Sequence, residues 1–241
     1  MPAIKKYSKD FTYSYSFGVF PTLELLKNHP KDVLKVVFSP RGYKNAGVDE
    51  IKAICRKERI DIETSEGIVE KMSGSENTYA MGIFKKFANP IEKNTNHVVL
   101  VAPSDMGNLG TIIRTMLGLG YKDLAIIKPA VDIFDPRTIR ASMGSIFTIR
   151  FQYFSTFKDY QNANPQQHFY PFMGNAQNSL EKVHFSQPFS LIFGNESTGL
   201  NAEFKNIGTS VSIPQTKQID SFNLSIAVGI SLYEANKLLL A

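Results

Sequence analysis

The stretch "HVVLVAPSDMGNLGTIIRTMLGLGYKDLAIIKP", His97 to Pro129, decides the fold class of the larger part of this chain. It contains an apolar run over 97–103, an amphipathic run over 107–120 that ends on Gly120, and a second apolar run over 123–129. Strands that are apolar throughout and alternate with helices are typical of a parallel sheet covered on both faces. The stretch therefore predicts a strand, a helix and a second strand of an α/β fold.

The same alternation continues to the end of the chain. Further strands are predicted over 147–154, 168–174, 189–196 and 208–214. Helices are predicted over 135–144 and 157–163, and a final helix is predicted to begin at Ser221. Together these segments predict one parallel α/β domain over residues 91–241.

The N-terminal part has a different pattern and predicts a second, smaller α/β domain over residues 1–90. Helical patterns cover 22–30 and 48–60, and strand patterns cover 32–40 and 79–87. The segment "ANPIEKNTN" at 88–96 is polar and contains a proline, as domain boundaries commonly do.

Composition limits the classes of function. Residues 1–90 hold 15 Lys and Arg against 11 Asp and Glu, and the whole chain has a net charge of +5. This balance suits a nucleic acid partner, and a solvated lysine-rich surface is the alternative. The sequence shows no membrane-length apolar run and no signal peptide, and its single cysteine, Cys55, cannot form an internal disulfide. We therefore expect a cytoplasmic protein without membrane contact, and the scattered histidines predict no zinc site.

Three loops follow predicted strands at the sheet edge where parallel α/β proteins bind ligands. In the first, Asn108 and Gly110 stand at a helix start and Arg114 follows within reach of that start. The loop is neither a phosphate-binding loop of the Walker type nor a GxGxxG turn. An ordinary surface arginine is the alternative for Arg114.

The second loop is "LIFGNESTGL", 191–200, in which Gly194 and Gly199 permit close backbone approach to a ligand. Glu196 lies between them and either faces the ligand or caps the following turn. In the third loop Ser221 fits a helix N-cap and Asn223 lies in the predicted first turn.

The final helix carries Ala227 and Gly229 where a core helix normally has larger residues. Small residues allow close approach of another backbone. This approach occurs either at a subunit interface or at a tight crossing within the chain.

In this order and spacing, "NLGTIIRT", "LIFGNESTGL" and "IPQTKQIDSFNLSIAVGISLYE" resemble the three motifs of the SpoU (TrmH-like) RNA ribose 2′-O-methyltransferases, a family of the SPOUT superfamily. The resemblance spans about residues 97–240, and "RASMGSIFTI" is similar to an intermediate segment of the family. Residues 13–87 more loosely resemble the L30e-like substrate-binding domain that often precedes the catalytic domain.

The resemblance implies a C-terminal trefoil knot that binds S-adenosyl-L-methionine, a homodimer formed through the knotted domain, and RNA as substrate. It implies catalytic roles for five residues, and the matching positions are Asn108, Arg114, Glu196, Ser221 and Asn223. It implies cofactor contacts at Gly194, Ile213 and Phe222. Arg114 is expected to grip the phosphate beside the reacting ribose and to stabilise the developing alkoxide.

The chain departs from the family pattern at three positions. Lys217 and Ser197 stand where the motifs commonly have glycine, and Phe222 replaces a frequent leucine. The expected function is methylation of a ribose 2′-hydroxyl in RNA, foremost 23S ribosomal RNA. The alternatives are a transfer RNA 2′-O-methyltransferase, a non-catalytic RNA-binding protein that keeps the fold, and a nucleotide-binding α/β enzyme.

Overall fold

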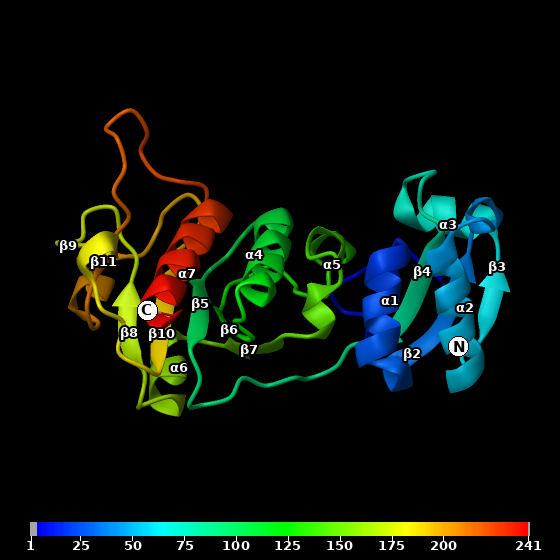
Figure 1. Cartoon of the computed structure of the whole chain (residues 1–241), viewed down its shortest axis with the longest axis horizontal. Coiled ribbons are helices and arrows are strands. Elements are labelled where there is room, and N and C mark those ends of the chain that lie inside the picture. The colour runs from blue at the N-terminus through cyan, green and yellow to red at the C-terminus, as the bar shows by residue number, and fades with distance from the viewer. Residues whose placement is uncertain (1–3, 241) are drawn as a thin grey trace. The chain divides into compact units, whose positions relative to one another are not determined.

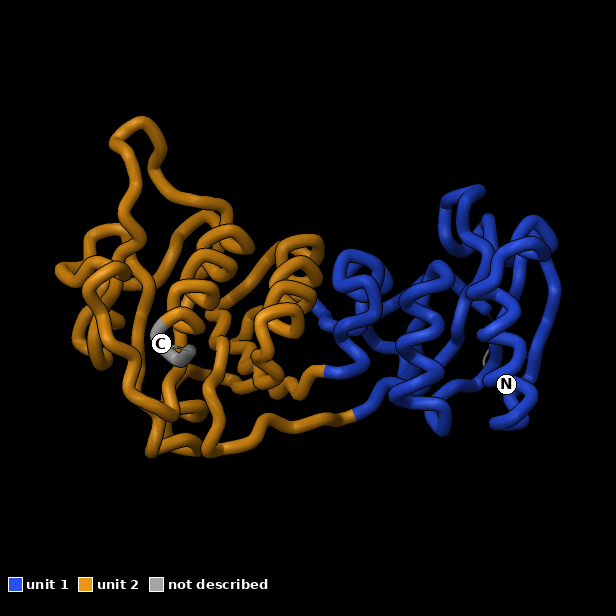
Figure 2. The backbone as a smooth tube through the Cα atoms, viewed as in Figure 1, with its two compact units in different colours: residues 1–87, 132–148 blue, residues 88–131, 149–241 orange. Residues whose placement is uncertain are grey.

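The structure is a computed structural model that describes residues 4–240. The chain forms two compact units (Figure 2). Unit 1 consists of the residues up to Phe87 together with Asp132–Thr148, and unit 2 consists of Ala88–Val131 and the residues from Ile149 onward. The sequence predicts a boundary after residue 90, which would place residues 132–148 in the larger domain. In the structure, however, this segment returns to unit 1.

Unit 2 is built on a five-stranded sheet whose neighbouring strands are all parallel (Figure 1). The strands are β5 (His97–Val101), β6 (Asp123–Ile127), β7 (Arg150–Phe154), β8 (His168–Pro171) and β10 (Phe189–Phe193). Their order is β7-β6-β5-β10-β8. The predicted parallel α/β architecture is confirmed.

Helices cover both faces of this sheet. α6 (Phe157–Ala163) and the short helix η5 (Ala202–Asn206) place Tyr160 and Phe204 against Val99, Ile127 and Ile192 on one face. α4 (Met106–Gly118) and α7 (Leu224–Leu240) pack side by side, as Figure 1 shows. Since side chains alternate along a strand, the intervening apolar residues of β5, β6 and β10 face the other side.

The segment after β10 differs from its prediction. The strand expected over 208–214 is reduced to β11 (Val211–Ser212), which pairs in parallel with β9 (Asn178–Ser179), close to the short helix η4 (Leu180–Lys182). Gly208 ends the preceding turn with a φ of 65°, and a Cβ there would lie 2.0 Å from the Phe169 carbonyl oxygen. The chain must therefore turn at this residue and cannot continue as a strand.

The final helix starts at Leu224 and not at Ser221 as predicted. Asn223 is the capping residue, because its Oδ1 accepts a hydrogen bond of 2.9 Å from the Ser225 N–H. Serine and asparagine are comparable N-caps, so residue type alone does not distinguish the two positions. Ser221 is left in the loop before the helix.

Unit 1 contains a mixed four-stranded sheet of order β1-β4-β2-β3. The strands are β1 (Tyr13–Phe17), β2 (Val33–Phe38), β3 (Ile62–Thr64) and β4 (Ala80–Lys85). β4 is antiparallel to both β1 and β2, and β3 is parallel to β2. β1 and β2 therefore run in the same direction and end opposite the first residues of β4.

Helices cover both faces of this sheet as well. α1 (Val19–Asn28) and α2 (Ala46–Glu58) pack on one face, and α3 (Glu66–Ser73) packs on the other. Short helices η1 (Pro30–Asp32) and η2 (Pro40–Gly42) lie in the connections on either side of β2. α1 lies close to the sheet because β4 has Gly82 beneath it, where a Cβ would lie 2.8 Å from Leu25.

Residues 132–148 complete the core of unit 1 through α5 (Pro136–Ala141) and η3 (Ser145–Phe147). The Ser14 hydroxyl donates a 2.5 Å hydrogen bond to the Phe134 carbonyl. The Phe147 ring meets Phe84 edge to face at 5.2 Å. Gly144, with a φ of 87°, lies so close to α1 that a Cβ would be 2.8 Å from that of Glu24.

A buried polar network joins the amino ends of the unit 2 strands. The Tyr160 hydroxyl lies 2.7 Å from Nδ1 of His97 and 2.6 Å from the Ser190 hydroxyl. The other His97 nitrogen lies 2.6 Å from the Glu92 carbonyl, which fixes the segment before β5. Burial is the largest influence on His97 and lowers its pKa, although the contact with Glu92 opposes it.

Within residues 4–240 we find no helix with the length and apolarity needed to cross a membrane. The same residues hold no group of three His, Cys, Asp or Glu side chains able to bind a metal ion.

The His97 network predicts a pH-dependent stability. The unfolded chain protonates its histidine near pH 6.5, whereas burial holds the folded pKa lower, so the unfolded state binds more protons below that pH. Urea denaturation followed by circular dichroism should show stability falling from about pH 7.5 to about pH 5.5, by up to about 1.4 kcal/mol per pH unit. His97→Gln should remove this slope and the exposed control His184→Gln should retain it. An unchanged slope in His97→Gln would show that another group is responsible.

The return of 132–148 to unit 1 predicts how a truncated chain behaves. Deleting residues 1–87 alone would expose the buried side chains of Ile133, Phe134 and Phe147, so we expect this fragment to aggregate. The same fragment with 132–148 replaced by a Gly-Ser linker should remain monodisperse in light scattering. A monodisperse simple truncation would show that 132–148 does not need unit 1.

Candidate active site at the carboxyl ends of β5 and β10

The site lies where the strand order of the unit 2 sheet reverses. β5 and β10 are neighbours, but the chain leaves β5 through α4 towards β6 on one side and reaches β10 after β8 on the other. The loops that follow the two strands therefore separate, and a crevice forms at their carboxyl ends. The loops over 102–105 and 194–200 border this crevice.

Glu196 ties these two loops together. Its Oε2 accepts hydrogen bonds from the Ser104 N–H at 3.0 Å and the Ser104 hydroxyl at 2.7 Å. Its Oε1 accepts from the Asp105 N–H at 3.1 Å and from Nδ2 of Asn108 at 3.3 Å. Burial raises the pKa of Glu196, but the hydrogen bonds from Ser104 and Asn108 outweigh it, so the pKa lies below its usual value. Glu196 is thus an ionised carboxylate with both oxygens occupied, and it is poorly suited to accept a proton.

Asn108 connects this carboxylate to the final helix. Its Oδ1 accepts a 3.0 Å hydrogen bond from Nδ2 of Asn223, the residue that caps α7. Its backbone N–H donates at 2.7 Å to the carboxylate of Asp105, which caps α4. The starts of α4 and α7 are therefore joined to the loop after β10 through Asn223, Asn108 and Glu196.

The turn after β10 requires glycine at two positions. A Cβ on Gly194 would lie 2.1 Å from the carbonyl carbon of Gly199, and Gly199 has a φ of 65°. Asn195 fastens the turn, since its Nδ2 donates to the Ala102 carbonyl at 2.8 Å and its Oδ1 accepts from the Ser197 N–H at 2.9 Å.

A cavity of about 580 Å³ opens beside this turn, within unit 2. Segments 172–175, 193–202 and 213–227 supply most of its wall. Five of the predicted site residues line it, namely Gly194, Glu196, Ile213, Ser221 and Phe222. Its volume lies within the range of pockets that bind small organic molecules.

Arg114 is not among the residues that line the cavity. It lies on the solvent face of α4, where Thr111 and Gly118 are exposed as well. Among the described residues no acidic side chain pairs with it. The structure therefore does not bring Arg114 together with the other predicted residues within one chain.

The sequence-based list omits several residues of the site. Ser104 and Asp105 anchor Glu196, Asn195 fastens the turn, and the charged side chains of Lys205 and Asp220 border the cavity. Ser104, Asp105 and Asn195 come shortly after predicted strands, which is the signal that the sequence offers for them. Lys205 lies in η5 and Asp220 in the loop before α7, where the sequence carries no such signal. Their roles depend on contacts that join segments far apart in the chain.

The departures from the family motifs do not strain the backbone. Neither Ser197 nor Lys217 has a positive φ, so this chain needs no glycine at either position. In α7, a Cβ on Gly229 would lie 3.6 Å from the Thr115 side chain of α4, which is an ordinary contact. The crossing of α4 and α7 therefore does not require glycine, whereas Ala227 lines the cavity.

Comparison with known proteins identifies relatives of this chain. The sequence model of the SpoU rRNA Methylase family matches residues 95–233. An uncharacterized tRNA/rRNA methyltransferase of Synechocystis sp. is 34% identical over 143 residues, which cover 58% of this chain and 52% of the relative. The 23S rRNA (uridine(2479)-2′-O)-methyltransferase of Streptomyces viridochromogenes is 29% identical, over 61% of this chain and 54% of that protein. The chain thus matches about half the length of these curated relatives.

Among solved structures, the AdoMet-bound rRNA methyltransferase from Sinorhizobium meliloti superimposes with a TM-score of 0.81. It is 26% identical in sequence, and the match covers 95% of this chain and 89% of that one. The family match spans more than half of the chain and includes all eight predicted site residues. This chain belongs to the SpoU rRNA methylase family.

Proposed function

We propose that this chain transfers a methyl group from S-adenosyl-L-methionine to a ribose 2′-hydroxyl of RNA, and that its substrate is 23S ribosomal RNA. The observation that carries the proposal is the cavity beside the turn after β10, because its wall contains five of the eight residues that the family motifs mark. The family match and the 2′-O-methyltransferase activity of the Streptomyces viridochromogenes relative support the reaction type.

The cavity suits the cofactor in size and in chemistry. Phe193, Ile213 and Phe222 give it apolar surface for a purine, and the turn at Gly194 brings the backbone close to the cavity. Lys205 and Asp220 offer opposite charges for the carboxylate and ammonium of an amino acid. When bound, S-adenosylmethionine supplies a methyl group on a sulfonium centre.

The chain's own residues then position the ribose. Asn108 contacts the carboxylate of Glu196, Asn223 contacts Asn108, and Ser221 lines the same cavity. Glu196 holds the loops in place and does not serve as the base. The exposed guanidinium of Arg114 is available to bind a phosphate through paired hydrogen bonds. A cation held there would stabilise the alkoxide that develops as the hydroxyl attacks.

We assign RNA binding to unit 1 and the chemistry to unit 2. The rRNA methyltransferase from Sinorhizobium meliloti matches 95% of this chain, so the likeness extends over both units and supports ribosomal RNA. The excess of basic residues in 1–90 suits the same partner. A transfer RNA substrate and a non-catalytic RNA-binding protein are the competing outcomes of the tests below.

We further propose a homodimer formed through α7. Ile226 and Tyr233 are 51% and 57% exposed, and with Ile230 they form an apolar stripe along one face of the helix. An apolar stripe of this kind is suited to burial against a second copy. The trefoil knot and the cytoplasmic location expected from the sequence belong to the same proposal.

Arg114→Ala should lower methyl transfer by about 100- to 1,000-fold, because the phosphate and the alkoxide lose their cation. The measurement is transfer of tritiated methyl from S-adenosylmethionine to total ribosomal RNA, with Lys122→Ala, a second exposed cation of unit 2, as control. Calorimetry should give a cofactor affinity within about twofold of wild type, since Arg114 does not line the cavity.

Equal losses of cofactor affinity and turnover would instead give Arg114 a structural role. Wild type that binds the cofactor and RNA but labels neither ribosomal nor transfer RNA would establish the non-catalytic alternative. Label confined to transfer RNA would overturn the ribosomal assignment.

The double variant Ile226→Glu/Ile230→Glu should convert the dimer to a monomer, since charges would have to be buried at the interface. Light scattering of the full chain gives the mass, and Ile62→Glu, at an exposed isoleucine of β3, serves as control. A dimer that persists in the double variant would place the interface elsewhere.

A further inference from the structure

Exposed aromatic side chains gather at one edge of unit 1. In the part of the chain that the structure describes, the exposed aromatic residues are Phe20, Tyr43 and Tyr233. Phe20 and Tyr43, at 66% and 67% exposure, belong to unit 1, and neither is needed for the core of that unit. A single exposed ring is ordinary, but two rings at one edge of a unit mark a candidate interaction surface.

The topology brings these two rings to the same edge. β1 and β2 run in the same direction and end at Phe17 and Phe38, which pair with Met81 and Ala80 at the start of β4. Phe20 lies in the first turn of α1, directly after β1, and Tyr43 lies between β2 and α2.

The starts of α1 and α2 are in contact. A Cβ on Gly47, in the first turn of α2, would lie 2.4 Å from the side chain of Val19 at the start of α1. Phe20 therefore lies in the first turn of α1 and Tyr43 three residues before α2, where the starts of the two helices meet.

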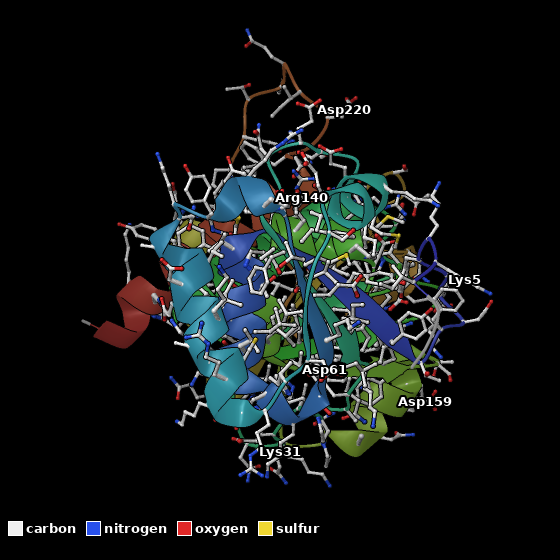
Figure 3. The ribbon with its side chains drawn as sticks, turned by 90° about the vertical axis from the view of Figure 1, so that its right-hand side faces the viewer. Lys5, Lys31, Asp61, Arg140, Asp159 and Asp220 are labelled. Atoms are coloured by element: carbon white, nitrogen blue, oxygen red, sulfur yellow. The ribbon has the colours of Figure 1, made fainter. Side chains whose placement is uncertain are left out.

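The segment 140–144 reaches the same edge. Gly144 packs against Pro21 and Glu24 of α1, and the neighbouring Met143 is 39% exposed. Figure 3 shows Arg140 near the upper end of unit 1, away from Lys31 and Asp61, which lie where α1 ends and just before β3 begins.

Two cations at this edge have no acidic partner among the described residues. Lys44 and Arg140 are exposed, and the ammonium of Lys44 lies 5.3 Å from the centroid of the Tyr43 ring. Arg41, by contrast, pairs with Glu66 at one end of α3 and is not available to a ligand. Gly18 gives the start of α1 no side-chain cap, which leaves the N–H groups of Val19 and Phe20 for an anion, whereas Pro21 has no N–H.

We infer that Phe20, Tyr43, Lys44 and Arg140, here called the aromatic edge, bind a single-stranded segment of the RNA substrate. Bases unstacked in a loop or bulge stack on the rings of Phe20 and Tyr43, and Lys44 and Arg140 contact the phosphates that flank them. Duplex RNA offers no exposed base faces and gains nothing from the rings. The inference rests on the proposed function, because it assumes that unit 1 engages RNA.

The test uses the full chain and fluorescence anisotropy with a labelled oligouridine of about 12 nucleotides and a duplex RNA of the same length. Phe20→Ala/Tyr43→Ala should weaken oligouridine binding by about 10- to 100-fold and leave duplex binding unchanged. Tyr43→Phe keeps the ring and should bind as wild type does. Ile62→Ala, which alters an exposed apolar residue of β3, is the matched control.

The cations have a separate signature. Lys44→Ala/Arg140→Ala should reduce the slope of log affinity for oligouridine against log salt by about 1.4, because two single-strand phosphate contacts are lost. An unchanged slope would remove the cations from the proposal. Equal losses of oligouridine and duplex binding in the aromatic variant, or no loss at all, would overturn the aromatic edge.

The outcome is separable from that of the proposed function. Cofactor affinity, measured by calorimetry, should be unchanged in all of these variants, since the cavity lies within unit 2. If wild type transfers no methyl group yet the aromatic variant loses oligouridine binding, the aromatic edge stands and the methyltransferase proposal fails. If the wild type transfers the methyl group and the aromatic variant binds oligouridine as tightly as the wild type does, the methyltransferase proposal stands and the aromatic edge fails.

Discussion

The arrangement of the site depends on one carboxylate. Glu196 follows the last strand of the parallel sheet and accepts four hydrogen bonds from Ser104, Asp105 and Asn108 on the connection after β5. The two strands are neighbours, but their connections run to opposite sides of the sheet. Asn195 adds a second tie between the same loops through the Ala102 carbonyl, and Glu196 supplies the charged tie at the point where the sheet opens.

This bridge also explains why the site is rich in amides and hydroxyls. In the proposed reaction the methyl group on the sulfonium is already activated, so a hydroxyl that attacks it needs alignment more than a strong base. Asn108 and Asn223 extend the bridge to the start of α7. In each of them both the oxygen and the nitrogen of the side-chain amide are hydrogen-bonded, and the Asn108 backbone N–H bonds to Asp105 as well. These polar side chains therefore hold one another in position, so this part of the site is preorganised for a ligand.

The sequence predicted the features that repeat locally and missed those that depend on distant contacts. Apolar runs alternating with helices were sufficient for the parallel sheet, and the glycines at 194 and 199 marked a turn that indeed requires them. β1 was not predicted, although its "YSYSF" alternates aromatic residues with serines as a strand does; the serines are buried as well, and Ser14 is paired with the distant Phe134 carbonyl. The start of the final helix was misplaced for a local reason, since Ser221 and Asn223 are comparable caps by residue type and the Ser225 N–H bonds to Asn223. Arg114 lies on the solvent face of α4 and outside the cavity, so its role remains a prediction.

The return of residues 132–148 to unit 1 has a consequence for biosynthesis. A chain leaving the ribosome folds its amino-terminal parts first, and a domain contiguous in sequence can close as soon as its last residue emerges. Unit 1 cannot do so, because Phe134 and Phe147 must still be translated after β5, α4 and β6 before its core is complete. The nascent protein therefore carries an unfinished hydrophobic surface through the synthesis of about a third of the other unit, and this interval is when chaperone protection would matter most.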